Sequence, residues 1–451
     1  MLAPHRSQDP LLVDPILPTL TRLAAPNMAA MMATTLVAIA ETAYVGGLGT
    51  PALAGLALVF PMVMLQQMLS GGAMGGGVSS AIARAVGAGD PQRADALVLH
   101  ATIIGLSAGL FFALIIGLFG AQIYGALGGR GAALDSALAY SNMFALAVVF
   151  IWLTNTFAAI VRGGGNMRIP STSLFMAAAL QIAVGGALGL GLGPLPRLGM
   201  MGVALGQVAA FGASALFLGY YIASGRARAQ LTLKGQKLHG GLFADILKVG
   251  ALSCASPVQS VATVMIVTRV IAYFGPEALA GYGVGARLEF LLIPIAFAIG
   301  VACIPMVGMA IGAGDVARAR RVAWTGGALS AILLGAAGLL FAVFPQLWTD
   351  MFTRDAAAAA AAHSYLQWSG PFYAAYGLAL CLYFASQGSG KMIGPVLAQS
   401  VRLIIVSVGG FALVKAQAPA WTMFAVVGVS LAAYGAAVAA AVALTPWGRD
   451  A

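Results

Sequence analysis

Two carboxylates interrupt long apolar stretches of this chain. Glu41 follows an apolar run that begins at Leu23, and Glu289 lies deeper inside a later run, two residues after Arg287. An ionisable residue at the centre of a membrane helix costs about 2.5–3.5 kcal/mol on insertion scales, so it is a candidate for function. We interpret Glu41 as a proton carrier, although a carboxylate at the membrane surface that reaches water would fit the same position. For Glu289, an ion pair between helices is slightly favoured over a coupling role.

Uncharged polar residues in the same half of the chain could assist Glu41. Asn155 and Gln181 stand in apolar surroundings, where hydrogen bonding between helices would explain either of them equally well. Pro26 is expected to bend the helix that carries Glu41. We therefore expect Glu41, Asn155 and Gln181 to serve proton coupling and substrate binding, with Glu289 as the candidate second carboxylate.

Motifs for other kinds of chemistry are poorly represented. Cys254, Cys303 and Cys381 lie in apolar segments without zinc-ligand spacing, so we expect neither a metal site nor a disulfide framework. The helices contain no HExxH motif, paired aspartate motif or Ser/His dyad. Glycine-rich turns at Arg162 and Gln387 complete no Walker pattern. We expect a protein that is not an enzyme and has no cofactor.

Membrane-spanning helices must position these residues. Of the 451 residues, 61% are hydrophobic and 8% are charged, which lies outside the range of soluble domains. About twelve stretches reach the roughly 20 apolar residues that a bilayer-spanning helix needs. Sixteen of the Lys and Arg residues fall on one set of alternate connections and four on the other, which explains the net charge of +10 without nucleic acid. We expect a multi-pass protein of the plasma (inner) membrane with both termini in the cytoplasm.

The chain repeats itself at half its length. The sequence AVGAGD at residues 85–90 returns as AIGAGD at residues 310–315, and GGGNMRIP at residues 163–170 returns as GSGKMIGP at residues 388–395. Both pairs have an offset of 225 residues, which predicts two homologous halves. Glycines at residues 71–77 have GxxxG spacing, so we expect a neighbouring backbone to pack closely there.

These patterns predict an all-α membrane protein with twelve transmembrane helices in two six-helix lobes. An even number of helices in each half restores the orientation, so the lobes should be related by a pseudo-two-fold axis along the membrane normal. The expected boundaries are residues 1–225 for the first lobe, 226–244 for a basic cytoplasmic linker and 245–451 for the second lobe.

Several stretches together resemble the multidrug and toxic compound extrusion (MATE) family over essentially the whole chain. They are ETAYVGGLGTPALAG from Glu41, the repeated GAGD, VRGGGNMRIP from Val161 and GARLEFLLIP from Gly285. The resemblance implies two lobes around a V-shaped cleft and export of organic cations in exchange for inward H⁺ or Na⁺. It places Glu41 where many bacterial members have an aspartate tied to proton coupling, and Gln181 where an asparagine is common.

Departures from the family pattern favour the DinF-like, proton-coupled branch over the NorM-like, sodium-coupled members. The acidic residues that NorM-like members have on the seventh and tenth helices are absent, since these helices offer Gln259 and YAAYG from Tyr373. The chain also departs from the DinF-like pattern, because Gly185 stands where those relatives often have a second aspartate. We expect a monomeric secondary active multidrug exporter of small organic cations, coupled to H⁺ rather than Na⁺. The alternative is a flippase for lipid-linked precursors, although only Arg269, Arg287 and Arg402 lie within the spans.

Overall fold

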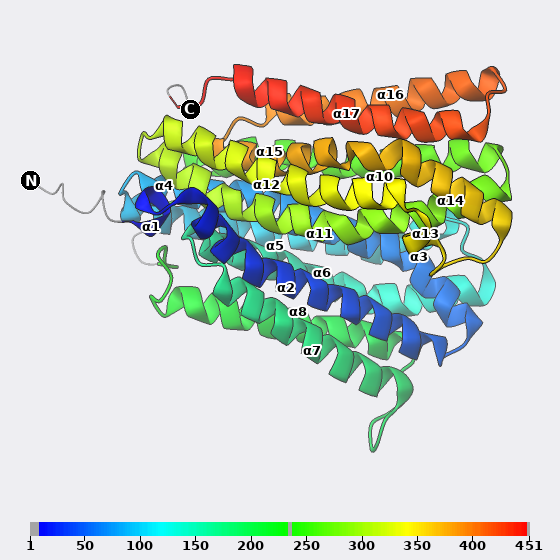
Figure 1. The fold of residues 1–451 in the computed structure, drawn as a ribbon. Helices are drawn as coiled ribbons and strands as arrows, with labels where there is room; N and C mark the ends of the chain where they lie inside the picture. The colour runs from blue at the N-terminus through cyan, green and yellow to red at the C-terminus, as the bar shows by residue number, and fades with distance from the viewer. Residues whose placement is uncertain (1–8, 233–236, 449–451) are drawn as a thin grey trace, which may run out of the picture. The chain divides into compact units, whose positions relative to one another are not determined.

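The computed structural model describes residues 9–232 and 237–448, and helices account for most of them (Figure 1). The first half of the chain contains α1 (Pro10–Val13), α2 (Ile16–Gly46), α3 (Thr50–Gln67), η2 (Met68–Met74), α4 (Gly75–Gly87), α5 (Pro91–Ala126), α6 (Gly131–Gly163), α7 (Arg168–Leu190) and α8 (Met200–Ala223). The segment η2 is π-helical and joins α3 to α4 without a break, so Thr50–Gly87 forms one long span.

The second half follows the same plan. It contains α9 (Gly240–Ser253), α10 (Ala255–Tyr273), α11 (Pro276–Gly312), α12 (Val316–Val343), α13 (Gln346–Thr349), α14 (Ala356–Ser369), η3 (Gly370–Phe372), α15 (Tyr373–Ser389), α16 (Ile393–Lys415) and α17 (Ala420–Leu444). In the described part of the chain, eleven helices are long and apolar enough to cross a membrane. The remaining predicted crossing is divided by the short 3₁₀ turn η3 into α14 and α15, of 14 and 17 residues. The predicted all-α membrane fold is confirmed, with one crossing interrupted.

The repeated GAGD motif forms the same turn in both halves. Gly89 and Gly314 have φ values of +70° and +82°, in the left-handed region that glycine adopts without strain. The next residue, Asp90 or Asp315, accepts a hydrogen bond from the backbone N–H three positions later, at 2.9 or 2.8 Å, and so caps α5 or α12. The sequence repeat is therefore also a structural repeat, in which one helix ends and the next begins.

Packing divides the chain into two compact units that differ from the predicted boundaries. The first unit is Ala25–Gly250, and the second unit comprises Ala251–Ala451 together with the chain up to Ala24. The start of each half therefore packs with the remainder of the other half. Helix α2 passes from one unit to the other between Ala24 and Ala25, next to Pro26, and α9 does so between Gly250 and Ala251. We call residues 9–24 and the described residues between 226 and 250 (226–232 and 237–250) the exchanged segments.

Two arginines at equivalent repeat positions bind the exchanged segments. Arg93 forms a salt bridge to Asp245 at 2.8 Å in the first unit. Arg318, 225 residues later, donates from Nε to the carbonyl oxygen of Leu11 at 3.1 Å and from a terminal nitrogen to that of Asp14 at 2.7 Å, in the second unit. These contacts give the physical reason for the shifted boundaries, since each exchanged segment is bonded to the unit in which it is packed.

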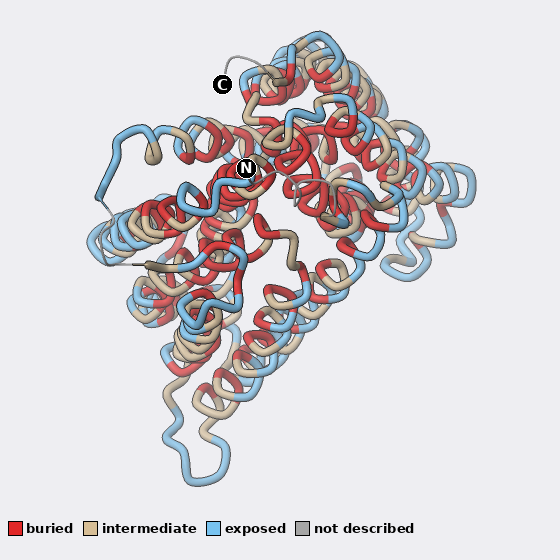
Figure 2. The backbone as a smooth tube through the Cα atoms, turned by 90° about the vertical axis from the view of Figure 1, so that its left-hand side faces the viewer, coloured by how far each residue is buried: buried red, intermediate tan, exposed pale blue. Residues whose placement is uncertain are grey.

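Side chains fill the space between the helices of each unit. Figure 2 shows buried residues along the helix faces that turn toward neighbouring helices, and exposed residues on the opposite faces. In the second unit, one continuous apolar cluster includes Leu288, Tyr365, Tyr373, Phe424 and Leu431, drawn from α11, α14, α15 and α17. In the first unit, α6 contributes Trp152 and Phe144 to the interior. Polar groups in these interiors therefore need partners of their own.

The glycine stretch at residues 71–77 allows close packing, as predicted. A Cβ atom at Gly77 would lie 2.6 Å from the backbone nitrogen of Gly250 and 2.8 Å from the carbonyl oxygen of Ile246. Gly77→Ala is therefore expected to lower the free energy of unfolding by about 1–3 kcal/mol, because neither backbone atom can move aside cheaply. The midpoint of thermal unfolding in detergent measures this effect.

Gly117→Ala is the matched control for that substitution. Gly117 lies in the span α5 and has no atom within 4 Å of its hypothetical Cβ. Alanine is favoured over glycine inside a helix by roughly 0.5–1 kcal/mol, so this variant should be neutral or slightly stabilised. Equal destabilisation of both variants would contradict the packing explanation.

Candidate functional site

Glu41 lies near the end of α2 with its carboxylate turned into the first unit. The residue is 8% exposed, and its Oε1 accepts a hydrogen bond of 2.9 Å from the hydroxyl group of Tyr140 on α6. Oε2 accepts a longer bond of 3.4 Å from Nε2 of Gln181 on α7. Each carboxylate oxygen therefore has one neutral donor, supplied by a different helix.

A further glutamine extends the network to α8. Nε2 of Gln207 donates to the Tyr140 hydroxyl oxygen at 2.7 Å, so that hydroxyl group accepts one bond while it donates another to Glu41. Gln207 is 3% exposed, and its Oε1 has no hydrogen-bond partner. Four helices, α2, α6, α7 and α8, thus converge on one buried polar cluster, which we call the Glu41 network.

The charge of Glu41 has no fixed counter-ion in the described part of the chain. The three salt bridges found among these residues involve Asp14 and Asp245 and do not include Glu41. When such a buried carboxylate is ionised, neutral hydrogen-bond donors stabilise its negative charge only in part. It can therefore attract a mobile cation or take up a proton.

Tyr44 lies one turn beyond Glu41 on α2, and its hydroxyl group lies next to Gly185 of α7. A Cβ atom at Gly185 would lie 3.1 Å from the Tyr44 hydroxyl oxygen, so this tyrosine occupies the space next to the glycine. The Tyr44 hydroxyl group is buried and has no hydrogen-bond partner. The cluster therefore contains one carboxylate and an unsatisfied hydroxyl group on the same face of α2.

The structure does not bring Asn155 into the Glu41 network, although the sequence suggested this grouping. Asn155 Nδ2 donates to Ser70 Oγ at 2.8 Å and to Gln67 Oε1 at 3.2 Å, beside the π-helix η2. The physical reason is its position on α6, because 15 residues beyond Tyr140 corresponds to about 22 Å along a helix. Asn155 thus ties α6 to the second crossing and leaves Gln181 as the predicted residue that contacts Glu41.

Glu289 is held by two tyrosines in the second unit. The hydroxyl groups of Tyr365 and Tyr373 both donate to its Oε1, the latter at 3.2 Å. The Arg287 guanidinium lies 5.2 Å from the ring centre of Phe352, so the prediction that Arg287 and Glu289 have separate partners is confirmed. Among the described residues, none of the salt bridges involves Glu289, and the favoured interhelical ion pair is therefore not found.

The tyrosines were missed by the sequence analysis, although a signal for them exists. Tyr140 and Tyr365 are separated by the repeat offset of 225. Tyr140 donates its hydroxyl hydrogen to the buried carboxylate of Glu41, and Tyr365 donates to the half-buried carboxylate of Glu289. The carboxylates occupy different helices, since Glu41 lies on α2 and Glu289 on α11. Alignment of the two halves at this offset would have found the tyrosine pair, but not the acid that each one contacts.

Metal-ligating side chains do not cluster in the described residues, where no group of three or more His, Cys, Asp or Glu could hold a metal ion. Cys303 and Cys381 are buried with their sulfur atoms 3.7 Å apart, and both are free. The sulfur atoms therefore act as packing groups in the interior of the second unit.

Comparison with known proteins matches both halves of the chain. A model of the MatE family matches residues 26–186 and 256–411. A probable multidrug resistance protein NorM of Deinococcus radiodurans is 29% identical over 421 residues, 86% of each chain. The FAD transporter of Shewanella oneidensis is 23% identical over 315 residues, 69% of each chain. The structure of a MOP superfamily transporter from Pyrococcus furiosus has the same fold, with a TM-score of 0.86 over 95% of both chains at 21% identity.

Proposed function

Because this chain belongs to the MATE family, whose members are transporters and not enzymes, we propose that it exports organic cations in exchange for H⁺. The observation that carries the proposal is the Glu41 network, a buried carboxylate without a fixed counter-ion among the residues that the structure describes. Relatives named as multidrug resistance proteins support multidrug efflux as the general function.

The exchange follows from the charge of one side chain. Ionised Glu41 attracts a positively charged substrate, while Tyr140 and Gln181 donate hydrogen bonds that stabilise the charge. A proton that binds to Glu41 removes this charge, and the substrate is no longer held. One proton thus replaces one cation. For a substrate with a single positive charge this exchange moves no net charge across the membrane, so the pH gradient drives it.

The chemistry of the neighbouring groups favours H⁺ over Na⁺. Hard metal cations bind several oxygen ligands at once. Around Glu41, the Tyr140 hydroxyl and the Gln181 amide present hydrogen atoms to the carboxylate, so their positive ends face the site. A proton needs only one carboxylate oxygen. This argument also supports placement in the proton-coupled, DinF-like branch.

A flippase for lipid-linked precursors remains the alternative function. Such a protein needs cationic groups that face its anionic substrate. Two of the three arginines predicted within the spans have other surroundings, since Arg287 lies over Phe352 and Arg402 is buried with its guanidinium 5.3 Å from the ring centre of Tyr376. These contacts favour cation export.

Efflux from proteoliposomes tests the proposal. The purified protein is reconstituted, loaded with ethidium, and supplied with either a pH gradient or a Na⁺ gradient. We expect ethidium movement under the pH gradient alone. Movement under the Na⁺ gradient alone would refute H⁺ coupling, and transport of a fluorescent lipid-linked pyrophosphate without ethidium transport would establish the flippase.

We also propose that the protein is a monomer in the plasma membrane. Its proposed orientation places both termini in the cytoplasm. It rests on the asymmetric distribution of Lys and Arg between the connections. Arg6, Lys234 and Arg449 belong to the larger group but lie outside the described residues. Cysteine substitutions at Arg228 and Arg130, each labelled by a membrane-impermeant reagent, test the orientation, because only the Arg130 position should react from outside.

Tyr140→Phe is expected to weaken binding of the cation roughly tenfold, because the variant loses about one charge-assisted hydrogen bond. The variant removes the 2.9 Å donor to Glu41 and leaves Gln207 without its acceptor. Equilibrium binding of ethidium to purified protein measures the change. Tyr124→Phe is the control, because Tyr124 is equally buried and bonds Ser141. Equal loss in both variants would contradict a direct role for Tyr140.

A further inference from the structure

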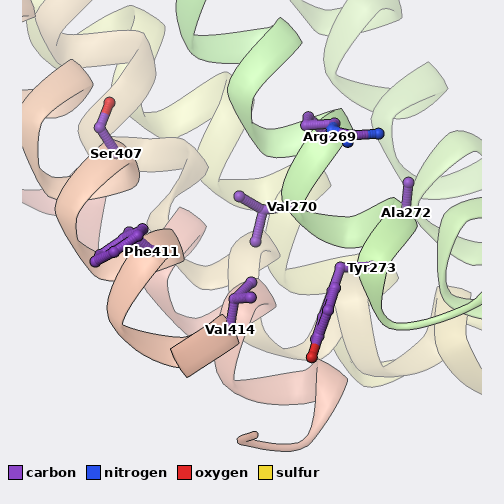
Figure 3. Close-up of a pocket in the computed structure, with 7 residues that line it drawn as sticks. All are labelled: Arg269, Val270, Ala272, Tyr273, Ser407, Phe411 and Val414. Carbon is purple, nitrogen blue, oxygen red and sulfur yellow. The ribbon is translucent and has the colours of Figure 1, made fainter. Parts of the chain in front are cut away.

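A groove runs between the last turns of α10 and α16 in the second unit. It has a volume of about 380 Å³ and is lined by Arg269, Val270, Ala272, Tyr273, Ser407, Phe411 and Val414. Figure 3 shows Val270 of α10 beside Phe411 and Val414 of α16 along one part of this groove, and the Arg269 side chain extending from α10 on the side away from Phe411. The groove thus combines an apolar channel with one guanidinium group.

Arg269 is an exposed cation without a bonded partner among the described residues. None of the hydrogen bonds or salt bridges found there involves it, and Glu277, the nearest acid in the sequence, forms no ion pair. Tyr273 lies one turn further on, where α10 ends, and is 58% exposed. Arginine and tyrosine near a helix end are typical of the level of the lipid headgroups.

The neighbouring face of α16 is apolar and exposed. Ile404, Val408 and Phe411 are 58%, 63% and 71% exposed and recur at helical spacing. In a membrane protein such a face is solvated by acyl chains, because water would not stabilise it. Lys415 directly follows Val414 at the end of α16, so a second cation lies at the same end of the groove.

We propose that this groove is a binding site for one anionic phospholipid. The Arg269 guanidinium donates hydrogen bonds to the phosphate group, in the geometry that makes arginine a strong phosphate ligand. One acyl chain lies against Phe411, Val414 and Val270. The guanidinium has no acidic partner in the described residues, so a headgroup with a net negative charge is favoured over a zwitterionic one. This site is separate in sequence and in unit from the Glu41 network.

Thermal stabilisation of the delipidated protein by added lipid tests the proposal, because a ligand that binds the folded state raises its stability. Phosphatidylglycerol is titrated in detergent, and the unfolding midpoint is followed by tryptophan fluorescence. Arg269→Gln should require roughly ten times more lipid for the same rise, as expected for one lost charge-assisted bond. Phe411→Ser, at an exposed position, should also weaken the response. Arg130→Gln, an exposed arginine on the same predicted side, should respond like the parent.

Each alternative outcome overturns a specific part of the proposal. An equal rise with inorganic phosphate or glycerol phosphate would identify a soluble anion as the ligand. An equal rise with phosphatidylcholine would remove the preference for a net negative headgroup. Equal losses of the lipid response in Arg269→Gln and Arg130→Gln would attribute the stabilisation to general surface charge and not to the groove. If phosphatidylglycerol did not raise the unfolding midpoint of the parent protein, the site would be refuted.

Discussion

Glu41→Gln is expected to yield a folded protein that no longer exchanges a cation for a proton. Glutamine has the same size and keeps an oxygen for the Tyr140 hydroxyl group, which is 2.9 Å from Glu41, but it cannot ionise. Ethidium efflux driven by a pH gradient should fall to the level of empty liposomes. Proton release on addition of ethidium to the detergent-solubilised protein should disappear in parallel.

Glu289→Gln is the matched comparison, because it neutralises the other carboxylate that accepts hydrogen bonds from tyrosine hydroxyl groups. This variant should retain proton-coupled efflux if Glu41 alone carries the proton. The reverse result, with active Glu41→Gln and inactive Glu289→Gln, would move the coupling site to the second unit. Unchanged unfolding midpoints in both variants establish that any loss reflects function and not folding.

Asp245→Asn is expected to lower the free energy of unfolding by about 2 kcal/mol. Asp245 lies between Arg84, at 2.6 Å, and Arg93, at 2.8 Å, so asparagine would leave two guanidinium groups without a negative charge. Breaking a buried ion pair costs about 3–5 kcal/mol, and we reduce this value because the Arg93 side chain is 47% exposed. Thermal or denaturant-induced unfolding in detergent measures the loss.

Two further variants make the Asp245 prediction specific. Asp135→Asn is the control, because Asp135 is exposed and should change stability by less than about 0.5 kcal/mol. In the double variant Arg84→Met, Asp245→Leu, part of the stability should return, since no uncompensated charge remains between these two positions. An Asp245→Asn protein as stable as the parent would show that the exchanged segment is held by apolar packing alone.

The exchanged segments illustrate what a sequence repeat cannot reveal. The offset of 225 correctly predicts equivalent turns, and Arg93 and Arg318 occupy equivalent positions in them. It does not tell which chain segment each arginine binds, because a repeat is equally compatible with partners from its own half or from the other half. Only the packed structure decides that Arg93 binds Asp245 and that Arg318 binds the carbonyl groups near Asp14.

The amino-acid sequence by itself determined the membrane helices, the repeat and the unusual position of Glu41. These features are local, since helix length, hydropathy and turn chemistry depend on residues that are close in the chain. The partners of Glu41 are not local: Tyr140 and Gln181 lie 99 and 140 residues away. Which of two polar residues on α6 faces Glu41 depends on depth along the helix and on its rotation in the packed unit. Tertiary structure therefore selected Tyr140 and excluded Asn155.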